Sequence, residues 1–150
     1  MIGVESTVVT VENKKLIVLR LGGVSLEDLK DVAEDVELRI NNSSDPKSPG
    51  QLKSHYAPKI SLRFGMMEEL LKEYATEKKA VLSFSRKYEA ENIVAQEILS
   101  TAGDLNEAAR NLFIALRRLD NSDAEIILAE KFPEHGLGLA INDRLERAAV

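Results

Sequence analysis

Hydrophobic residues in the first forty positions follow two spacings. Runs of β-branched and apolar residues on either side of the turn formers Asn13-Lys14 predict a β-hairpin. An apolar stripe at helical spacing follows Ser25, a favourable N-cap, and predicts a helix. The elements expected in this part are strands at 5–11 and 15–21, a helix from Ser25 to about 34, and a short strand at 36–40.

The hydrophobic pattern after residue 60 alternates between short apolar runs and longer helical stripes. The strands expected here are 60–64, 79–85, 96–99 and 124–129, and the expected helices are 66–74, 104–120 and 138–149. Strands that alternate with helices favour a parallel sheet with helices on its faces. We therefore expect a three-layer, Rossmann-like α/β fold with a mostly parallel sheet over about 60–150.

Turn-forming residues are concentrated between the two parts, at 41–59. A connection of this length inside a compact domain is usually functional or a true linker. A hairpin with one helix is too small to have its own core, so we expect 1–40 to be the end of a larger α/β domain. The predicted organisation is a domain tail at 1–40, a linker at 41–59 and an α/β domain at 60–150.

Composition narrows the functional classes. The 150 residues carry a formal net charge of -5, so a general attraction to nucleic acid is not expected. The absence of cysteine excludes disulfides and thiolate chemistry, and two histidines eighty positions apart do not form a metal-binding motif. No apolar run approaches the roughly 18–20 residues of a membrane span, and no signal-peptide layout is present. We expect a cytoplasmic protein without a membrane partner and without a metal site.

Scarce polar side chains mark three candidate sites. His55 and Tyr56 lie in the linker segment that is bounded by two prolines. Arg20 ends an apolar strand, where a guanidinium either binds phosphate or forms a structural salt bridge, with Glu27 or Asp28 as candidate partners. Ser6 and Thr7 begin a strand, where their hydroxyls can bind a ligand or simply reflect the β-propensity of such residues.

Five segments of the sequence stand out together: Gly3–Val9, Val18–Gly22, Ser48–Pro58, Ala109–Asp120 and Gly136–Ala149. In this order they resemble one family, the threonylcarbamoyl-AMP synthases of the two-domain type. Those enzymes have a YrdC-like catalytic domain, a linker with a Ser-Pro-Gly…His-Tyr-x-Pro motif, and a C-terminal Rossmann-like domain. Leu21 stands where the family usually has proline, and the family's Lys-x-Arg and Ser-x-Asn signatures are not present.

The resemblance implies the C-terminal part of an enzyme that makes threonylcarbamoyl-adenylate and pyrophosphate. The implied substrates are L-threonine, bicarbonate and ATP with magnesium, and the product serves tRNA threonylcarbamoyladenosine modification. It assigns Ser6 and Thr7 to the L-threonine pocket, Arg20 to the nucleotide phosphates, and His55 and Tyr56 to a lid over the nucleotide. We assign no catalytic residue, expect no cofactor bound by this chain alone, and expect it to be inactive without a YrdC-like catalytic domain in cis or in trans.

Two other functions remain open at this point. The chain fits a non-catalytic interaction module that docks on a separate catalytic subunit, because its hairpin has open sheet edges. It also fits a free nucleotide-binding α/β domain, because Gly136-x-Gly138 lies between a predicted strand and a helix. A tight turn explains those glycines more simply, and solvated helix faces explain Arg110, Arg117, Arg118, Arg144 and Arg147. Direct tRNA binding is not expected.

Overall fold

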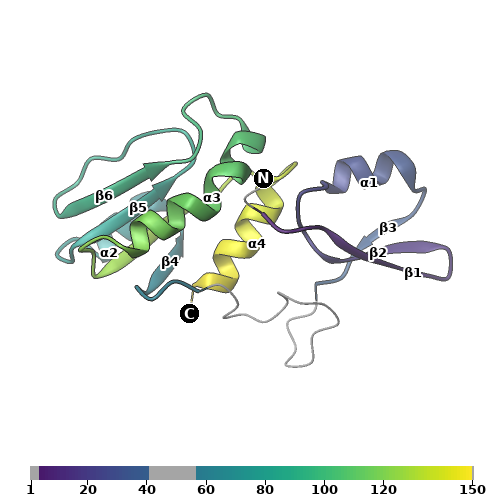
Figure 1. The fold of residues 1–150 in the computed structure, drawn as a ribbon, viewed down its shortest axis with the longest axis horizontal. Helices are drawn as coiled ribbons and strands as arrows, with labels where there is room; N and C mark the ends of the chain where they lie inside the picture. The colour runs from purple at the N-terminus through teal and green to yellow at the C-terminus, as the bar shows by residue number, and fades with distance from the viewer. Residues whose placement is uncertain (1–3, 41–56, 150) are drawn as a thin grey trace.

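The computed structural model describes residues 4–40 and 57–149, in two layered parts (Figure 1). The first part is a three-stranded sheet with order β1-β2-β3 and one helix. Its elements are β1 (Val8–Glu12), β2 (Lys15–Arg20), α1 (Leu26–Val32) and β3 (Val36–Leu38). The predicted hairpin is confirmed: β1 and β2 are antiparallel, and Asn13 and Lys14 form the turn with φ of 50° and 64°.

The second part is a four-stranded parallel sheet with order β4-β7-β5-β6. Its elements are β4 (Leu62–Gly65), α2 (Met67–Glu73), β5 (Lys79–Ser83), β6 (Ile93–Ile98), α3 (Leu105–Asp120), β7 (Ile126–Glu130) and α4 (Gly138–Ala148). This confirms the predicted α/β fold. The strand expected at 96–99 begins earlier, at Ile93, because β6 lies at the sheet edge, where alternating polar residues are tolerated.

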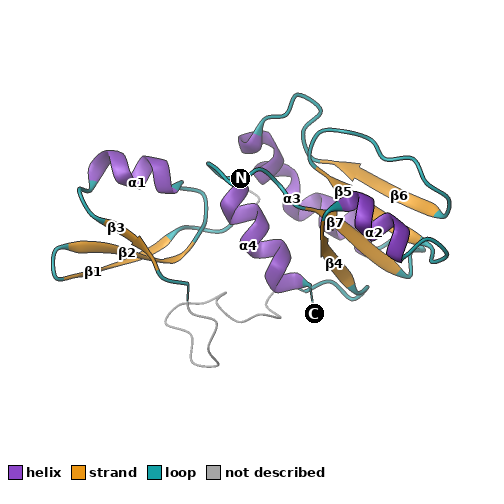
Figure 2. Ribbon diagram, turned by 180° about the vertical axis from the view of Figure 1, so that it is seen from behind, coloured by secondary structure: helices purple, strands orange, loops and turns teal. Residues whose placement is uncertain are grey.

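Helices cover both faces of the second sheet (Figure 2). Residues alternate along a strand, so Ala80 and Leu82 of β5 pack in the cluster formed with α3 and α4, whereas Val81 packs in the cluster formed with α2. The polypeptide therefore passes from β4 to α2 on one face and from β7 to α4 on the other. This arrangement gives the three layers that the alternating pattern predicts.

Helix α3 is the main apolar element of the second part. Asp104 caps its first turn by accepting a hydrogen bond from the Asn106 backbone N–H at 2.9 Å. Its buried residues recur at helical spacing, as the sequence predicts, and turn one stripe towards the sheet. They are Ala108, Ala109, Leu112, Ala115, Leu116 and Leu119.

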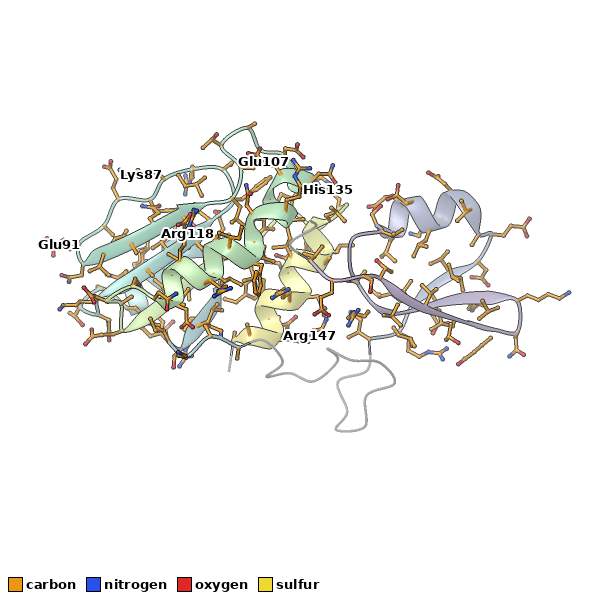
Figure 3. The ribbon with its side chains drawn as sticks, viewed as in Figure 1. Lys87, Glu91, Glu107, Arg118, His135 and Arg147 are labelled. Carbon is orange, nitrogen blue, oxygen red and sulfur yellow. The ribbon has the colours of Figure 1, made fainter. Side chains whose placement is uncertain are left out.

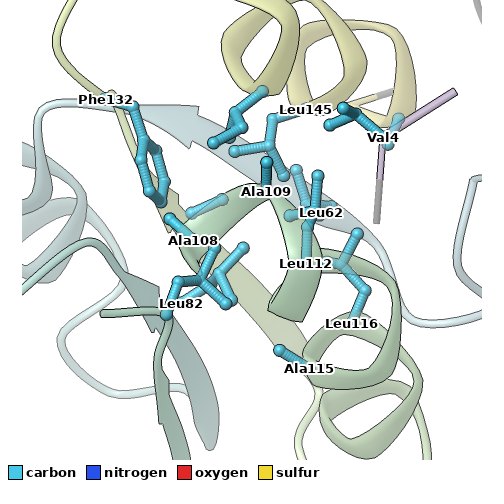
Figure 4. Close-up of a cluster of buried hydrophobic side chains, with 14 of the residues drawn as sticks. Val4, Leu62, Leu82, Ala108, Ala109, Leu112, Ala115, Leu116, Phe132 and Leu145 are labelled. Carbon is cyan, nitrogen blue, oxygen red and sulfur yellow. The ribbon is translucent and has the colours of Figure 1, made fainter. Parts of the chain in front are cut away.

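The first part packs against the second through Val4. This side chain is 6% exposed and belongs to the same buried cluster as Leu112 and Leu145 (Figure 4). Burial of a valine at this contact stabilises the arrangement by about 1.5–3 kcal/mol. The division at 41–59 stays a prediction, since 41–56 lie outside the described residues.

Among residues 4–40 and 57–149, no helix is long and apolar enough to span a membrane.

Candidate functional site

Arg20 holds Ser6 at the end of strand β2. Arg20 is 7% exposed, and its guanidinium donates from Nη2 to Ser6 Oγ at 3.1 Å and from Nε to the Ser6 carbonyl at 3.0 Å. Its Nη1 lies 2.8 Å from Glu5 Oε2. The structure therefore brings together two predicted site residues, Ser6 and Arg20. The ion pair of Arg20 is with Glu5, whereas the predicted partners Glu27 and Asp28 bind Gly136 and Ser25.

Thr7 was predicted with Ser6 to belong to the L-threonine pocket, and its hydroxyl is bound to the backbone. Thr7 Oγ1 donates to the Val24 carbonyl at 2.7 Å and accepts from the Val24 N–H at 3.1 Å. Gly22 lies so close to this segment that a Cβ there would be 2.2 Å from the Glu5 carbonyl oxygen. The absence of a side chain at Gly22 thus allows the segment that carries Ser6 and Thr7 to lie against the end of β2.

Helix α4 carries a buried ion pair next to this site. Asp143 binds Arg147 one turn away, and the two side chains are 11% and 9% exposed. Burial raises the pKa of Asp143, while the charges of Arg147 and Arg20 act against that rise. The expectation that Arg147 lies on a solvated helix face is wrong, because α4 packs that face inward, at the junction of the two parts (Figure 3).

A second contact joins α1 to the loop before α4. The Gly136 N–H donates to Glu27 Oε1 at 3.2 Å. Hydrogen bonds from the Glu27 and Gly136 backbones lower the pKa of Glu27. Gly136 has φ of 52°, and a Cβ on Gly138 would be 1.9 Å from the Pro133 carbonyl oxygen. These glycines form the tight turn that the sequence favours, and His135 is exposed as expected.

His55 and Tyr56, the predicted lid residues, lie outside the described residues. Their assignment to nucleotide binding stays a prediction. The described residues contain no group of three or more histidine, aspartate or glutamate side chains arranged to hold a metal ion.

Glu5 and Asp143 were not predicted as site residues. Glu5 directly precedes the predicted pair Ser6-Thr7, so its charge beside two hydroxyls was an available signal. Asp143 and Arg147 are four positions apart, which is the spacing of an intrahelical ion pair. Nothing in that spacing shows that the pair is buried, because burial depends on how α4 packs against residues distant in the sequence.

The parallel sheet with helices on both faces defines a Rossmann-like α/β domain, and a sheet fragment ending in a buried arginine precedes it. A family model described as "Threonylcarbamoyl-AMP synthase, C-terminal domain" matches residues 24–150. The chain belongs to this family.

Relatives with this name match the chain along almost all of its length. It is 35% identical to the threonylcarbamoyl-AMP synthase of Pyrococcus abyssi and 31% identical to that of Bacillus subtilis, each over 99% of this chain and 46% of the relative. The crystal structure of P. abyssi Sua5 complexed with L-threonine matches with a TM-score of 0.83 and 32% identity, over 99% of this chain and 46% of that one. The chain spans about half the length of the curated relatives it matches.

Proposed function

We propose that this chain is the C-terminal portion of an L-threonylcarbamoyladenylate synthase. In the complete enzyme, L-threonine, bicarbonate and ATP give threonylcarbamoyl-AMP and pyrophosphate, and the product feeds threonylcarbamoyladenosine formation in tRNA. The observation that carries the proposal is the match of 99% of this chain to 46% of two threonylcarbamoyl-AMP synthases. Magnesium enters with ATP, and a YrdC-like domain supplies the remaining part of the active site.

Ser6 is the proposed contact for L-threonine. Ser6 is exposed, and its Oγ accepts a hydrogen bond from Arg20. A hydroxyl that accepts one bond keeps its proton for donation, so Ser6 can donate to the substrate carboxylate. Thr7 contributes to the same pocket wall through its two hydrogen bonds with Val24. The solved complex of P. abyssi Sua5 with L-threonine supports an amino-acid pocket in this family.

Arg20 has a proposed role towards the nucleotide phosphates. Its guanidinium is buried, so the low dielectric around it strengthens its attraction for an anion. Glu5 neutralises this charge in the present structure. In the complete site, the nucleotide phosphates would bind the Arg20 guanidinium together with Glu5. Arg20 Nη2 would continue to orient the Ser6 hydroxyl. His55 and Tyr56 are proposed to close over the same nucleotide, which would exclude water from the reacting groups.

Complementation in trans tests this function. The N-terminal remainder of the P. abyssi relative is mixed with this chain, L-threonine, bicarbonate, Mg²⁺ and ATP, and pyrophosphate is measured. We expect no release by this chain alone and threonine-dependent release by the mixture. A Thr10→Val variant is the control for Ser6→Ala. Thr10 lies further along the same segment, within β1, and outside the cluster of Glu5, Ser6 and Arg20.

The Ser6→Ala variant should raise the KM for L-threonine at least about tenfold, which corresponds to the loss of one hydrogen bond to a charged group. Threonine-dependent pyrophosphate release by the isolated chain would contradict its assignment as an incomplete portion. An unchanged KM in Ser6→Ala would remove Ser6 from the threonine pocket.

A further inference from the structure

A groove opens at the carboxyl ends of three strands in the second sheet. The polypeptide leaves β4 towards α2 on one face and leaves β7 towards α4 on the other face. In open α/β sheets, a crevice forms where neighbouring strands lead to opposite faces, and small ligands bind there. The groove here has a volume of ≈ 450 Å³, and its lining includes Met66, Phe84, Arg86, Glu130 and Lys131. Ligand sites usually have volumes of about 300–1,000 Å³.

Two side-chain amides fix the loops that form the rim of this groove. Gln96 accepts from the Tyr88 N–H at 2.7 Å and donates to the Tyr88 carbonyl at 2.9 Å. Asn142 accepts from the Phe132 N–H at 2.7 Å and donates to the Phe132 carbonyl at 2.9 Å. In each loop, the amide therefore holds both the N–H and the carbonyl of one residue. A loop that is already ordered loses less conformational entropy when a ligand binds.

Glu130 is an oriented hydrogen-bond acceptor in the groove. Tyr88 Oη donates to Glu130 Oε1, and the Phe84 N–H donates to Oε2 at 2.8 Å. Burial, together with the hydrogen bond to Glu130, raises the pKa of Tyr88 to about 12, so the phenol remains a donor at neutral pH. Each carboxylate oxygen has a second lone pair, so Glu130 can also accept from an N–H group of a ligand.

Two cations stand at the rim, and their present partners are exposed. The Arg86 guanidinium lies 4.4 Å from the centre of the Tyr88 ring and forms an ion pair with Glu68. Lys131 Nζ lies 2.7 Å from Glu134 Oε1. All four charged side chains of these two pairs are at least 45% exposed. Exposed ion pairs of this kind contribute little to stability, so an incoming anion can replace the carboxylates at little cost.

Phe84 and Met66 form the apolar part of the groove lining. Phe84 is half-buried, and its ring centre is 5.3 Å from that of Phe132, which fixes its orientation. Met66 is 55% exposed at the end of β4. A flat ring between Phe84 and Met66 would bury apolar surface that is now open to water, and a methionine adapts its shape to such a ring.

We propose that this groove binds a mononucleotide, with the base against Phe84 and Met66, an exocyclic amine on Glu130, and the phosphate between Arg86 and Lys131. This site lies on residues other than those of the proposed synthase site at Ser6 and Arg20. It gives the C-terminal domain a ligand of its own, which goes beyond the proposed function.

Titration of the 150-residue chain with AMP, adenosine and inorganic phosphate tests the site. The readout is the change in backbone amide chemical shifts, with calorimetry for affinity. We expect AMP to bind with a Kd below about 1 mM and to shift the amides of Phe84–Tyr88 and Lys131–Phe132. Adenosine and phosphate alone should each bind at least about tenfold more weakly, because each fills half of the groove.

Charge-removing variants separate the groove from other anion sites. Arg86→Gln and Lys131→Gln should each weaken AMP binding at least about fivefold. The matched control is Lys87→Gln, which removes a charge from the same exposed loop outside the groove lining (Figure 3). Unchanged amide spectra away from the loops confirm folding of each variant. The proposal is overturned by absent AMP binding, by shifts centred on Ser6 and Arg20, or by equal weakening in Lys87→Gln.

Discussion

Asn142 and Phe132 are joined by two hydrogen bonds, one in each direction. The Phe132 N–H donates to Asn142 Oδ1 at 2.7 Å, and Asn142 Nδ2 donates to the Phe132 carbonyl at 2.9 Å. Both residues are buried, so this pair satisfies backbone groups that water cannot reach. The pair fixes the path of the chain from β7 into α4, and α4 carries the ion pair beside Arg20.

Replacement of Asn142 by alanine should lower the free energy of unfolding by about 2–6 kcal/mol. The variant leaves a buried donor and a buried acceptor of Phe132 without partners, and each costs about 1–3 kcal/mol. Urea denaturation followed by circular dichroism measures the change. Asn106→Ala, at an exposed position of α3, is the control and should stay within about 0.5 kcal/mol. Equal effects of the two variants would contradict the assigned role of Asn142.

Gly138 and Gly65 should respond very differently to alanine. A Cβ on Gly138 would lie 1.9 Å from the Pro133 carbonyl oxygen, whereas a Cβ on Gly65 has no atom within 4 Å. The backbone must shift to accept an alanine at position 138. We therefore expect Gly138→Ala to lower the free energy of unfolding by about 1–3 kcal/mol. Gly65→Ala should cause a much smaller change. Thermal unfolding of the two variants compares them, and a neutral Gly138→Ala would contradict the observed packing.

Tyr88 should ionise well above the usual pH range of a tyrosine. Its pKa is raised from 10.0 to about 12 by burial and by the hydrogen bond to Glu130. A raised pKa means that the neutral phenol is favoured in the folded state. The resulting stability is complete below about pH 10 and is lost as pH rises towards 12. Ultraviolet absorbance of phenolate against pH measures this step, and Tyr88→Phe should remove it. A Tyr88 step near pH 10 in folded protein would contradict the prediction.

The buried pair Asp143–Arg147 should show strong coupling. Asp143→Ala leaves the buried guanidinium of Arg147 without its carboxylate, and such a change costs about 3–5 kcal/mol. Replacing both residues, as Asp143→Leu with Arg147→Met, removes the charge as well as its partner and should cost much less. Denaturant unfolding of Asp143→Leu, of Arg147→Met and of the double variant gives the coupling energy. Additive losses would show that the pair does not act as a unit.

Most of the fold was predictable from hydrophobic spacing. The alternation after residue 60 indicated the parallel α/β sheet, and Asn13-Lys14 indicated the hairpin. Strand order was not predictable, because β7 lies between β4 and β5 through packing of helices on opposite faces. The parallel pairing of β3 with β2 was also missed, because three residues carry little pattern.

The candidate site was predictable in part. The family resemblance assigned Ser6 to the L-threonine pocket and Arg20 to the nucleotide phosphates, and Ser6 Oγ lies 3.1 Å from Arg20 Nη2. Glu5 was visible beside Ser6-Thr7, but its pairing with Arg20 and the burial of Arg147 follow from contacts between distant segments, which local spacing does not encode. Glu130 and Tyr88 were passed over for the same reason, since 42 positions separate them.

A chimaeric enzyme tests the central claim most directly. The part of P. abyssi threonylcarbamoyl-AMP synthase matched by this chain is replaced with these 150 residues, and threonylcarbamoyl-AMP is measured by mass spectrometry. We predict threonine-dependent product from the chimaera, a large loss with Ser6→Ala, and no product from the P. abyssi N-terminal part alone. A folded chimaera that makes no more product than that part alone would contradict the assignment of this chain to the synthase.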